Sequence, residues 1–453
     1  MNKLHKYAFS DLYDISSGIS STKEQAGHGA PFVSFRTVFN NYFLPNELPD
    51  LMDTSAADQE KCSVKKGDIL ITRTSETVDE LAMSCVVLKD YPKATFSGFV
   101  KRLKPKTTGI AYDKYMAFFL RSEYFRKVIN AKTIMTLRAS FNEDIFSFLD
   151  LYLPDYEEQV KIGDFLYNLE EKIQCNKKIN NNLQHQLKLM YDYWFTQFDF
   201  PDENGKPYRS SGGKMVWNEQ LKRQIPVDWC CITLADILSK NTQQFDYKNI
   251  LPTIDLSVMP SANIALSQVN TSDMFTTNLF IMTEGDLLFG GIRPYLRKAG
   301  IAPCNGVVAG TVHSYQVKNK NDYNFALSTI TSDIIFDYAV SVSTGTKMPV
   351  ISSDTLLAFK VPYSAEVAHK FNIVLNIKDT ICKNVQENLR LITLRDWLLP
   401  MLMNGQVGFK EEKPQIRVSG FEQWLATQGF AARGDVDMDV LRDIYEAIDD
   451  DDK

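Results

Sequence analysis

Few residues in this sequence have the types and spacing that catalysis needs. It contains no [DNS]PP[YFW] tetrapeptide of the kind used for amino-group methylation and no glycine-rich cofactor loop after a strand-like run. The phosphate-binding pattern GxxxxGK[ST] is also absent. One nuclease-like spacing, Asp155 with Glu170 and Lys172, falls on the start and flank of a predicted helix. Because that chemistry requires carboxylates on adjoining strands, helix capping and surface charge are the better interpretation.

Metal chemistry has equally little support in the sequence. The seven cysteines form no CxxC pair and have no histidine partner at metal-ligand spacing, and the five histidines are scattered. We therefore expect no metal site, and free or buried thiols in a reducing compartment.

Length and composition favour a multidomain globular protein. A chain of 453 residues suits two or three domains, and 44% hydrophobic with 23% charged residues is ordinary for a soluble protein. No apolar run approaches a membrane span and the N-terminal residues are too polar for a signal peptide, so a cytoplasmic location is expected. The net charge of −6 belongs entirely to residues 406–453, which hold 12 acidic and 6 basic residues. A balanced body can still carry a basic face.

The longest predicted element is a helix at 155–197. Apolar and amide residues recur there at steps of four and three, the pattern of a helix that packs along another long helix. About 36 helical residues would span roughly 54 Å, and Asp155 with Glu158 suits a capping box. The predicted seam positions in this helix are Ile162, Leu166, Leu169, Ile173, Asn176, Asn180, Leu183 and Leu187. The two asparagines are expected to set register and partner.

A second long helix is predicted at 363–405. Ser364 is its expected N-cap, and Pro400 is expected to stop or kink it. Its predicted seam positions are Phe371, Val374, Ile381, Val385 and Ile392. Since each long helix follows a mixed segment of similar size, the chain has the pattern of an internal repeat.

The two mixed segments, 1–154 and 230–362, share motifs in the same order. KKGDILITRT (65–74) matches TEGDLLFGGIRP (283–294), and SGFVKRLKPK (97–106) matches AGTVHSYQVK (309–318). These runs alternate or are continuously apolar between turn residues, which is typical of strands.

Two further segments complete the chain. Residues 198–229 are rich in Gly, Pro and Ser and are typical of a flexible linker, but their aromatic residues favour a strap pinned to the protein surface. Residues 406–453 form an acidic extension with two possible short helices and the ending DDDDK, which is either native or added.

This order of segments resembles the specificity subunit of type I restriction–modification systems. The most specific match is WFTQFDFPDENGKPYRSSGGKMVWNEQLKRQIPVDW (194–229), which resembles the strap after the first long helix of that family. YLPDYEEQ (152–159) resembles the family's entry into the first helix, and LRDWLLPMLMNGQV (394–407) its ending of the second. The resemblance covers roughly residues 1–409. The second helix entry, VPYSAEVAHKF, departs from it by lacking the Glu-Gln pair.

The resemblance implies an α+β fold in which two mixed target recognition domains are separated by two long antiparallel coiled-coil helices. It implies a non-catalytic reader of double-stranded DNA, with one domain for each half of a split, asymmetric target. Two adenine methyltransferase subunits and two translocating endonuclease subunits would dock on this frame. S-adenosylmethionine, ATP and magnesium would bind those partners, and this chain would bind no cofactor.

If the chain reads DNA, basic and polar side chains of the mixed domains are the candidates for base and phosphate contacts. Some Arg and Lys side chains bind the edge of guanine, and further basic side chains hold phosphates. Those in the first domain are Arg36, Arg73, Thr74, Lys101, Arg102 and Arg138. Those in the second domain are Arg293, Tyr295, Arg297, Lys298, His313 and Lys347. A solvated surface charge is the competing interpretation for each.

The expected methyltransferase-docking face is the exposed side of the helices with the strap. Its aromatic anchors would be Tyr193, Phe198, Trp217 and Trp229, unless these residues are core. Two other function classes compete with the DNA reader. A fused methyltransferase–endonuclease lacks its motifs here, and a coiled-coil scaffold would not need a second globular domain.

Overall fold

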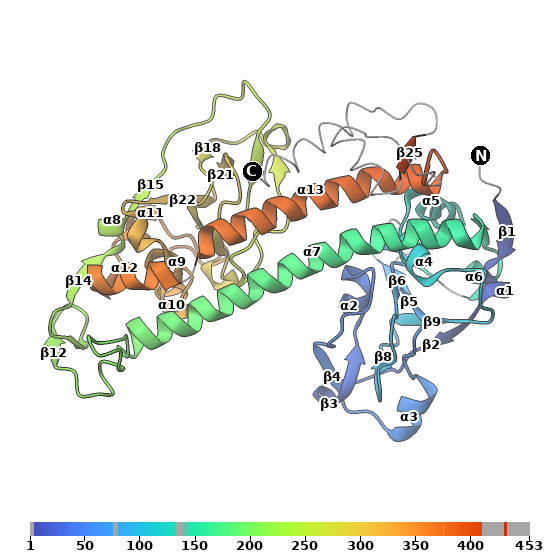
Figure 1. The fold of residues 1–453 in the computed structure, drawn as a ribbon, viewed down its shortest axis with the longest axis horizontal. Coiled ribbons are helices and arrows are strands. Elements are labelled where there is room, and N and C mark those ends of the chain that lie inside the picture. Colours follow the sequence, from blue (N-terminus) through green and yellow to red (C-terminus); the bar gives the residue numbers. More distant parts are fainter. Residues whose placement is uncertain are drawn as a thin grey trace, which may run out of the picture. The chain divides into compact units, whose positions relative to one another are not determined.

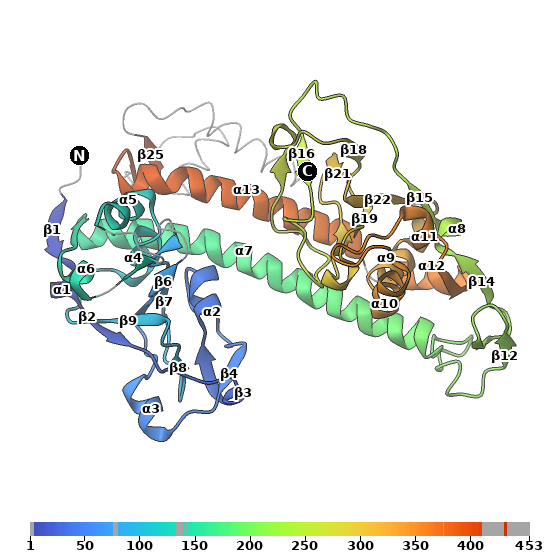
Figure 2. The same cartoon turned by 180° about the vertical axis from the view of Figure 1, so that it is seen from behind.

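The computed structural model describes residues 4–75, 80–132, 139–141, 143–374, 376–409 and 430–432. The chain divides into two compact units (Figure 1 and Figure 2). Residues 1–171 with 393–453 form unit 1, and residues 172–392 form unit 2. Both boundaries fall inside long helices, so each unit contains a part of each helix.

Unit 1 is organised on an antiparallel sheet with the strand order β2-β9-β5-β7. Smaller sheets, β4-β3-β8, β1-β11 and β10-β6, accompany it. The strands are β1 (His5–Ala8), β2 (Tyr13–Ser17), β3 (Ala26–Val33), β4 (Asp50–Met52), β5 (Ile69–Thr72), β6 (Thr74–Ser75), β7 (Ser84–Val86), β8 (Thr95–Phe96), β9 (Val100–Pro105), β10 (Ala139–Ser140) and β11 (Asp150–Leu153). The helices are α1 (Phe9–Leu12), α2 (Phe35–Asn40), α3 (Ala56–Lys61), α4 (Asp113–Phe119), α5 (Glu123–Lys132) and α6 (Glu143–Ser147).

Unit 2 has an antiparallel sheet of the same kind, with the order β15-β22-β19-β20. The sheets β17-β16-β21-β18, β14-β23 and β12-β13 accompany it. The strands are β12 (Met215–Asn218), β13 (Arg223–Pro226), β14 (Cys230–Thr233), β15 (Leu238–Lys240), β16 (Pro252–Ile254), β17 (Asn270–Thr271), β18 (Leu279–Met282), β19 (Leu287–Gly290), β20 (Ala299–Ile301), β21 (Gly306–Ala309), β22 (Val312–Val317) and β23 (Lys360–Tyr363). The helices are α8 (Leu234–Ile237), η3 (Ser272–Met274), η4 (Pro294–Leu296), η5 (Lys320–Asp322), α9 (Tyr323–Ile330), α10 (Asp333–Val342) and α11 (Ser353–Leu357).

The matched sequence motifs occupy matched places in the two sheets. The GDILIT run forms β5 and the GDLLFG run forms β19, each next to the strand from the second shared motif, β9 or β22. The turn before each strand is also the same. Gly67 and Gly285 have φ values of 88° and 85°, which glycine adopts readily. The following aspartate, Asp68 or Asp286, accepts a hydrogen bond from the backbone N–H three residues earlier, at 2.9 and 2.8 Å.

The first predicted long helix is present as α7 (Tyr156–Tyr191), which continues into a π-helix, η2 (Asp192–Thr196). All eight predicted seam residues are buried or half-buried. Asn176 and Asn180 are among the buried ones, as the apolar periodicity around them predicted. Their amides therefore need partners inside the protein.

The prediction of one continuous second long helix is wrong. It is divided into α12 (Ala365–Val374) and α13 (Ile377–Met403), with Asn376 outside both helices. The β-branched and asparagine residues around the break have weak helix propensity, and asparagine suits the start of a new helix. Phe371, Ile381 and Val385 are buried and Ile392 is half-buried, but Val374, at the break, is 52% exposed and does not belong to the seam.

Of the two outcomes expected at Pro400, a stop or a kink, the structure excludes the stop. Pro400 lies inside the helix, which continues to Met403. Gly405, with φ at 68°, ends it, and the Gln406 N–H returns to the Met401 carbonyl at 2.9 Å. This is the glycine-terminated ending of many helices. The described part of the extension forms β24 (Val407–Phe409) and β25 (Phe430–Ala432), and the predicted short helices lie largely outside the described residues.

Amide pairs connect α7 and α13 within unit 2. Asn176 Nδ2 donates to Asn388 Oδ1 at 3.0 Å, and Asn384 Nδ2 donates to Asn180 Oδ1 at 2.8 Å. Residue numbers rise on one helix as they fall on the other, so the helices run antiparallel there. Within unit 1 the two helices share an ion pair, Arg395 Nη1 with Glu170 Oε2 at 2.8 Å, in which both side chains are largely buried.

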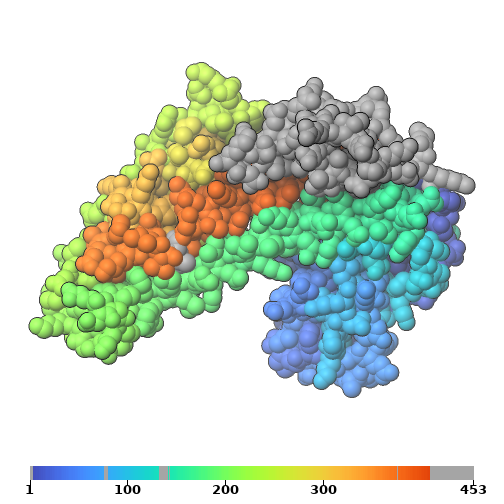
Figure 3. Space-filling model, in the orientation of Figure 1, coloured from blue at the N-terminus to red at the C-terminus, as the bar shows by residue number. Residues whose placement is uncertain are grey.

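The segment 198–229 is a pinned strap, and the flexible-linker interpretation is wrong. It contains the β12–β13 hairpin, and its residues form part of the surface of unit 2 (Figure 3, green). Phe200 stacks on Trp229 with ring centroids 5.2 Å apart, and both side chains are buried. Asp199 accepts hydrogen bonds from the backbone N–H and hydroxyl of Ser210 at 2.7 and 2.6 Å. These contacts hold the strap in one conformation.

Candidate nucleic-acid interface

In each unit, backbone hydrogen bonds connect three segments at the point where an inner strand of the main sheet, β5 or β19, ends. We call this arrangement the joint. In unit 1 the Arg73 N–H donates to the Phe99 carbonyl at 2.8 Å, and the Phe141 N–H donates to the Arg73 carbonyl at 2.8 Å. In unit 2 Gly291 takes the place of Arg73, bonding Thr311 and Ile351 at 2.9 Å each. Three separate segments therefore meet at the same place in both units and carry several of the predicted site residues.

In unit 1 the two segments bonded at the joint carry an exposed cation and an exposed aromatic residue. Arg73 is exposed, Thr74 is half-buried, and Phe99 is 62% exposed. Arg36 is exposed on α2, whose N-cap is Ser34. Arg138 lies outside the described residues.

In unit 2 the joint leads into a tight turn, η4, with Arg293 before it and Arg297 after it. Both arginines have left-handed backbone conformations, with φ at 53° and 54°. Arg293 and Tyr295 are exposed, as is Lys347 in the neighbouring segment. That segment is attached through a hydrogen bond from the Arg293 N–H to the Pro349 carbonyl at 2.7 Å.

Two of the predicted DNA contacts in unit 1 have internal partners. Lys101 is only 7% exposed, and its Nζ donates to Ser17 Oγ at 2.9 Å and lies 3.4 Å from Glu143. Arg102 donates to the Ser63 carbonyl at 2.5 Å and to Ser16 Oγ at 3.2 Å. These contacts favour a structural role for both residues over the predicted contact with DNA.

Three predicted residues of unit 2 are likewise half-buried and paired. Arg297 forms an ion pair with Asp333, and Lys298 donates to the Leu256 carbonyl. His313 Nε2 lies 3.0 Å from the Ile351 carbonyl, and burial lowers the pKa of its imidazole. A lowered pKa keeps this histidine neutral, which suits an internal hydrogen bond better than phosphate binding.

Exposed apolar residues next to the joint are not among the predicted site residues. Phe99, Leu296 and Met348 are exposed there. The predicted contacts with DNA were limited to basic and polar side chains, which leaves out apolar residue types. For Phe99 and Leu296 the signal that could have found them is position, because Phe99 lies inside one repeated motif and Leu296 lies two residues after another.

The four predicted docking anchors divide into two pairs. Tyr193 and Trp217 are exposed and remain candidates. Phe198 and Trp229 are core residues, with ring centroids 5.3 Å apart, and the prediction that they are surface anchors is wrong. Aromatic residues in a polar segment stabilise the segment itself when they can pack on one another.

The nuclease-like trio has separate partners along α7. Asp155 Oδ1 lies 3.0 Å from His5, Glu170 pairs with Arg395, and Lys172 pairs with Glu387. Among the described residues, no group of three or more His, Cys, Asp or Glu side chains is placed to hold a metal ion.

No single described helix is long and apolar enough to cross a membrane. One bent pair, Lys320–Ile330 with Asp333–Val342, meets the length and composition criteria jointly.

Comparisons with known proteins agree with this architecture. Residues 4–185 match the family model for the type I restriction modification DNA specificity domain. The chain is 21% identical over 422 residues to the type I restriction enzyme MjaIX specificity subunit of Methanocaldococcus jannaschii, covering 88% of this chain and 93% of that protein. It is 30% identical over 193 residues to the HindI specificity subunit of Haemophilus influenzae, covering 42% of this chain and 40% of that one.

A solved structure shares the fold. The type I restriction–modification S subunit from M. genitalium superposes with a TM-score of 0.50 at 15% identity, covering 91% of this chain and 97% of that one. Residues 4–185 are thus similar to the type I restriction modification DNA specificity domain, and most of the chain is similar in sequence to a type I specificity subunit.

Proposed function

We propose that this chain selects the DNA sequence for a type I restriction–modification complex by reading a bipartite, asymmetric target, one half-site per unit. The observation that carries this proposal is the duplicated joint after β5 and β19. Each copy combines a backbone held by hydrogen bonds from three segments with exposed side chains of the kinds that contact DNA. A rigid scaffold with variable exposed side chains is what sequence recognition requires.

The contacts would divide into positioning and reading. Exposed cations such as Arg36 and Lys347 would hold phosphates, which fixes the orientation of each unit on the duplex. Arg73 and Arg293, next to the joints, would reach base edges, where an arginine recognises guanine through two hydrogen bonds. Because the body of the chain has no excess positive charge, affinity would depend on these local contacts and on partner subunits.

The paired helices would set the separation of the half-sites. An α-helix rises 1.5 Å per residue, so the 36 residues of α7 correspond to about 54 Å. Successive major-groove sites on one face of DNA are about 34–36 Å apart, which is the same scale. The buried amide pairs of α7 and α13 support this role, since they oppose sliding of one helix along the other.

Catalysis would reside in partners. Two adenine methyltransferase subunits would dock on the helices and strap, with Tyr193 and Trp217 as anchors, and two restriction–translocation subunits would complete the complex. S-adenosylmethionine, ATP and magnesium would bind those subunits, and the whole complex would act in the cytoplasm, where its DNA is.

The test is methylome sequencing of the source cell with and without this gene. We expect loss of N6-methyladenine at one split motif with a constant spacer. If the partner methyltransferase stays active and its motif stays intact without this chain, the proposed function is wrong.

A further inference from the structure

The turn from Arg293 to Arg297 in unit 2 has an unusual backbone. Both flanking arginines adopt the left-handed conformation, which residues other than glycine rarely occupy, and the 3-10 turn η4 lies between them. A strained conformation persists only where the surrounding structure holds it, and such positions concentrate at functional sites.

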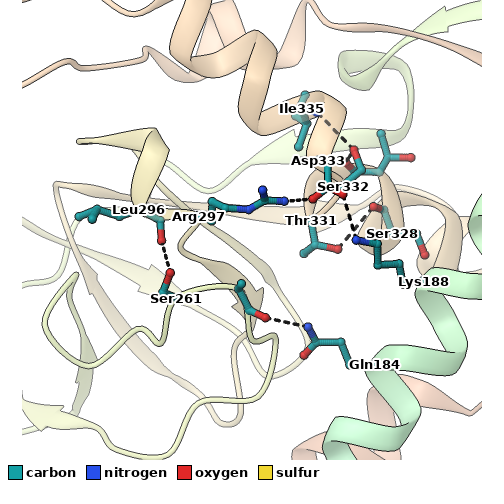
Figure 4. A network of polar contacts seen from close by, with 12 residues as sticks. Gln184, Lys188, Ser261, Leu296, Arg297, Ser328, Thr331, Ser332, Asp333 and Ile335 are labelled. Atoms are coloured by element: carbon teal, nitrogen blue, oxygen red, sulfur yellow. Dashed lines mark hydrogen bonds and ion pairs between the residues drawn. The ribbon is translucent and has the colours of Figure 1, made fainter. Parts of the chain in front are cut away.

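Contacts from several segments hold this turn. The Arg293 N–H bonds the Pro349 carbonyl, and the Ala262 N–H bonds the Arg297 carbonyl at 2.8 Å. Ser261 Oγ donates to the Leu296 carbonyl at 2.6 Å (Figure 4). The turn is therefore rigid before any partner arrives.

An ion-pair chain connects the turn to α7. Asp333, the first residue of α10, receives Arg297 on one carboxylate oxygen and Lys188 of α7 on the other, the latter at 2.9 Å (Figure 4). The Arg297 guanidinium also lies over the Phe336 ring, 5.4 Å from its centroid. Asp333 thus fixes the turn against the long helix.

Tyr295 and Leu296 form the tip of this turn, and their side chains indicate a role beyond stability. Tyr295 is 52% exposed and Leu296 is also exposed, although Pro294 between the joint and the tip is buried. Exposed Arg293 and Lys347 lie on the two segments joined at Pro349. A rigid aromatic and aliphatic tip flanked by cations matches a DNA groove, since apolar side chains contact thymine methyls or enter base steps while cations hold phosphates.

We propose that Tyr295 and Leu296 form a preformed base-contacting tip that determines specificity at one half-site, with Asp333 as its positioning residue. This inference rests on the proposed function and adds the residues that discriminate bases in unit 2. A preorganised tip loses little conformational entropy on binding. This small entropy loss offsets the free-energy cost of holding two arginines in a strained backbone.

The experiment compares methylomes of cells in which the chain carries Tyr295→Ala, Tyr295→Ala with Leu296→Ala, or Asp333→Asn. Each tip variant should relax base preference at one half-site by on the order of tenfold, with the other half-site and the spacer unchanged. Asp333→Asn should relax the same positions, and Asp333→Glu should restore them, since a carboxylate is needed to receive both cations.

Tyr247→Ala is the matched control, because Tyr247 is an exposed tyrosine of unit 2 that also has a positive φ, 58°. It should leave the motif unchanged. A split motif that persists unaltered in both tip variants overturns the base-contacting tip while leaving the proposed function intact. Relaxation of the same positions by Tyr247→Ala also overturns it. A wild-type chain that supports no split motif overturns the proposed function itself.

Discussion

Two buried aspartates show how single residues support the repeated turn. Asp286 accepts hydrogen bonds from the Thr283 N–H, Asn241 Nδ2 and Ser314 Oγ at 2.8, 2.8 and 3.0 Å. Burial nevertheless raises the pKa of its carboxyl, as it raises that of Asp68 in unit 1. The charged form is therefore less favourable in the folded chain than in the unfolded one.

This shift predicts a pH dependence. The folded pKa of Asp286 lies above the unfolded value of about 3.9. The contribution of this carboxyl to stability therefore falls as pH rises from the unfolded pKa to the folded pKa. Asp286→Asn removes the titration, so its stability relative to wild type should be most favourable at neutral pH and should decline toward pH 4. Urea unfolding at a series of pH values measures this difference. A difference that does not vary with pH contradicts the raised pKa.

Of the aromatic residues predicted as docking anchors, a buried one and an exposed one lead to opposite predictions for stability. Trp229 contacts Phe195, Phe198 and Phe200 in the core, so Trp229→Ala should cost about 3–5 kcal/mol of unfolding free energy. Trp217 is 56% exposed, so Trp217→Ala should change stability by less than about 0.5 kcal/mol.

Urea unfolding and titration with the methyltransferase subunit separate the two effects. Trp217→Ala should weaken that binding by on the order of tenfold while the chain remains folded. If the Trp217→Ala chain binds the methyltransferase subunit as tightly as wild type, Trp217 does not belong to the docking face.

At the scale of elements, the helix seam combines apolar and polar layers. Ile162, Leu166 and Ile173 bury apolar surface, whereas Asn176 and Asn180 pair with amides of α13. Burial of a polar group is unfavourable unless it is hydrogen-bonded, so each pair stabilises one register and penalises the others.

A double-mutant cycle tests this layer. Asn388→Leu leaves the buried Asn176 amide without one of its acceptors and should lower stability by about 1–3 kcal/mol. The double variant Asn176→Leu with Asn388→Leu should recover most of that loss, because an apolar pair of similar size needs no hydrogen bond. Additive losses in urea unfolding are the result that contradicts a coupled pair.

At the scale of the whole molecule, the proposed spacer role of the helices can be tested by length. Seven residues inserted after Glu171 and seven after Ile392 keep the heptad phase and lengthen both helices by about 10 Å, or roughly three base pairs. Methylome sequencing should then find both half-sites unchanged and the spacer longer by that amount. An unchanged spacer contradicts the proposed role.

Much of the fold could be predicted from local patterns. Apolar steps of four and three identified α7, and the Gly-Asp motifs identified β5 and β19. The break before α13 escaped prediction, because the apolar spacing from Phe371 to Ile381 continues across Asn376.

The candidate site was less predictable than the fold. Cations at matched positions were found, but Lys101 and Arg102 have internal partners and Arg73 is exposed. Residue type and spacing do not distinguish these cases, since the partners come from segments tens of residues away. The strained turn at Arg293 was equally hidden, because its conformation depends on bonds to Ala262 and Pro349.

The sequence by itself determined the duplicated plan, the long helix α7 and the polar positions of its seam, because periodicity and repeated motifs are properties of the chain. Only the tertiary structure decided which cations are exposed, which aromatics are core, and which backbone is held in a strained turn. Those outcomes depend on contacts between distant segments, where a side chain is buried or exposed according to what packs beside it. The turn that carries Tyr295 is the clearest case, since its conformation depends on a bond between Arg297 and Ala262, 35 positions earlier, and one between Arg293 and Pro349, 56 positions later.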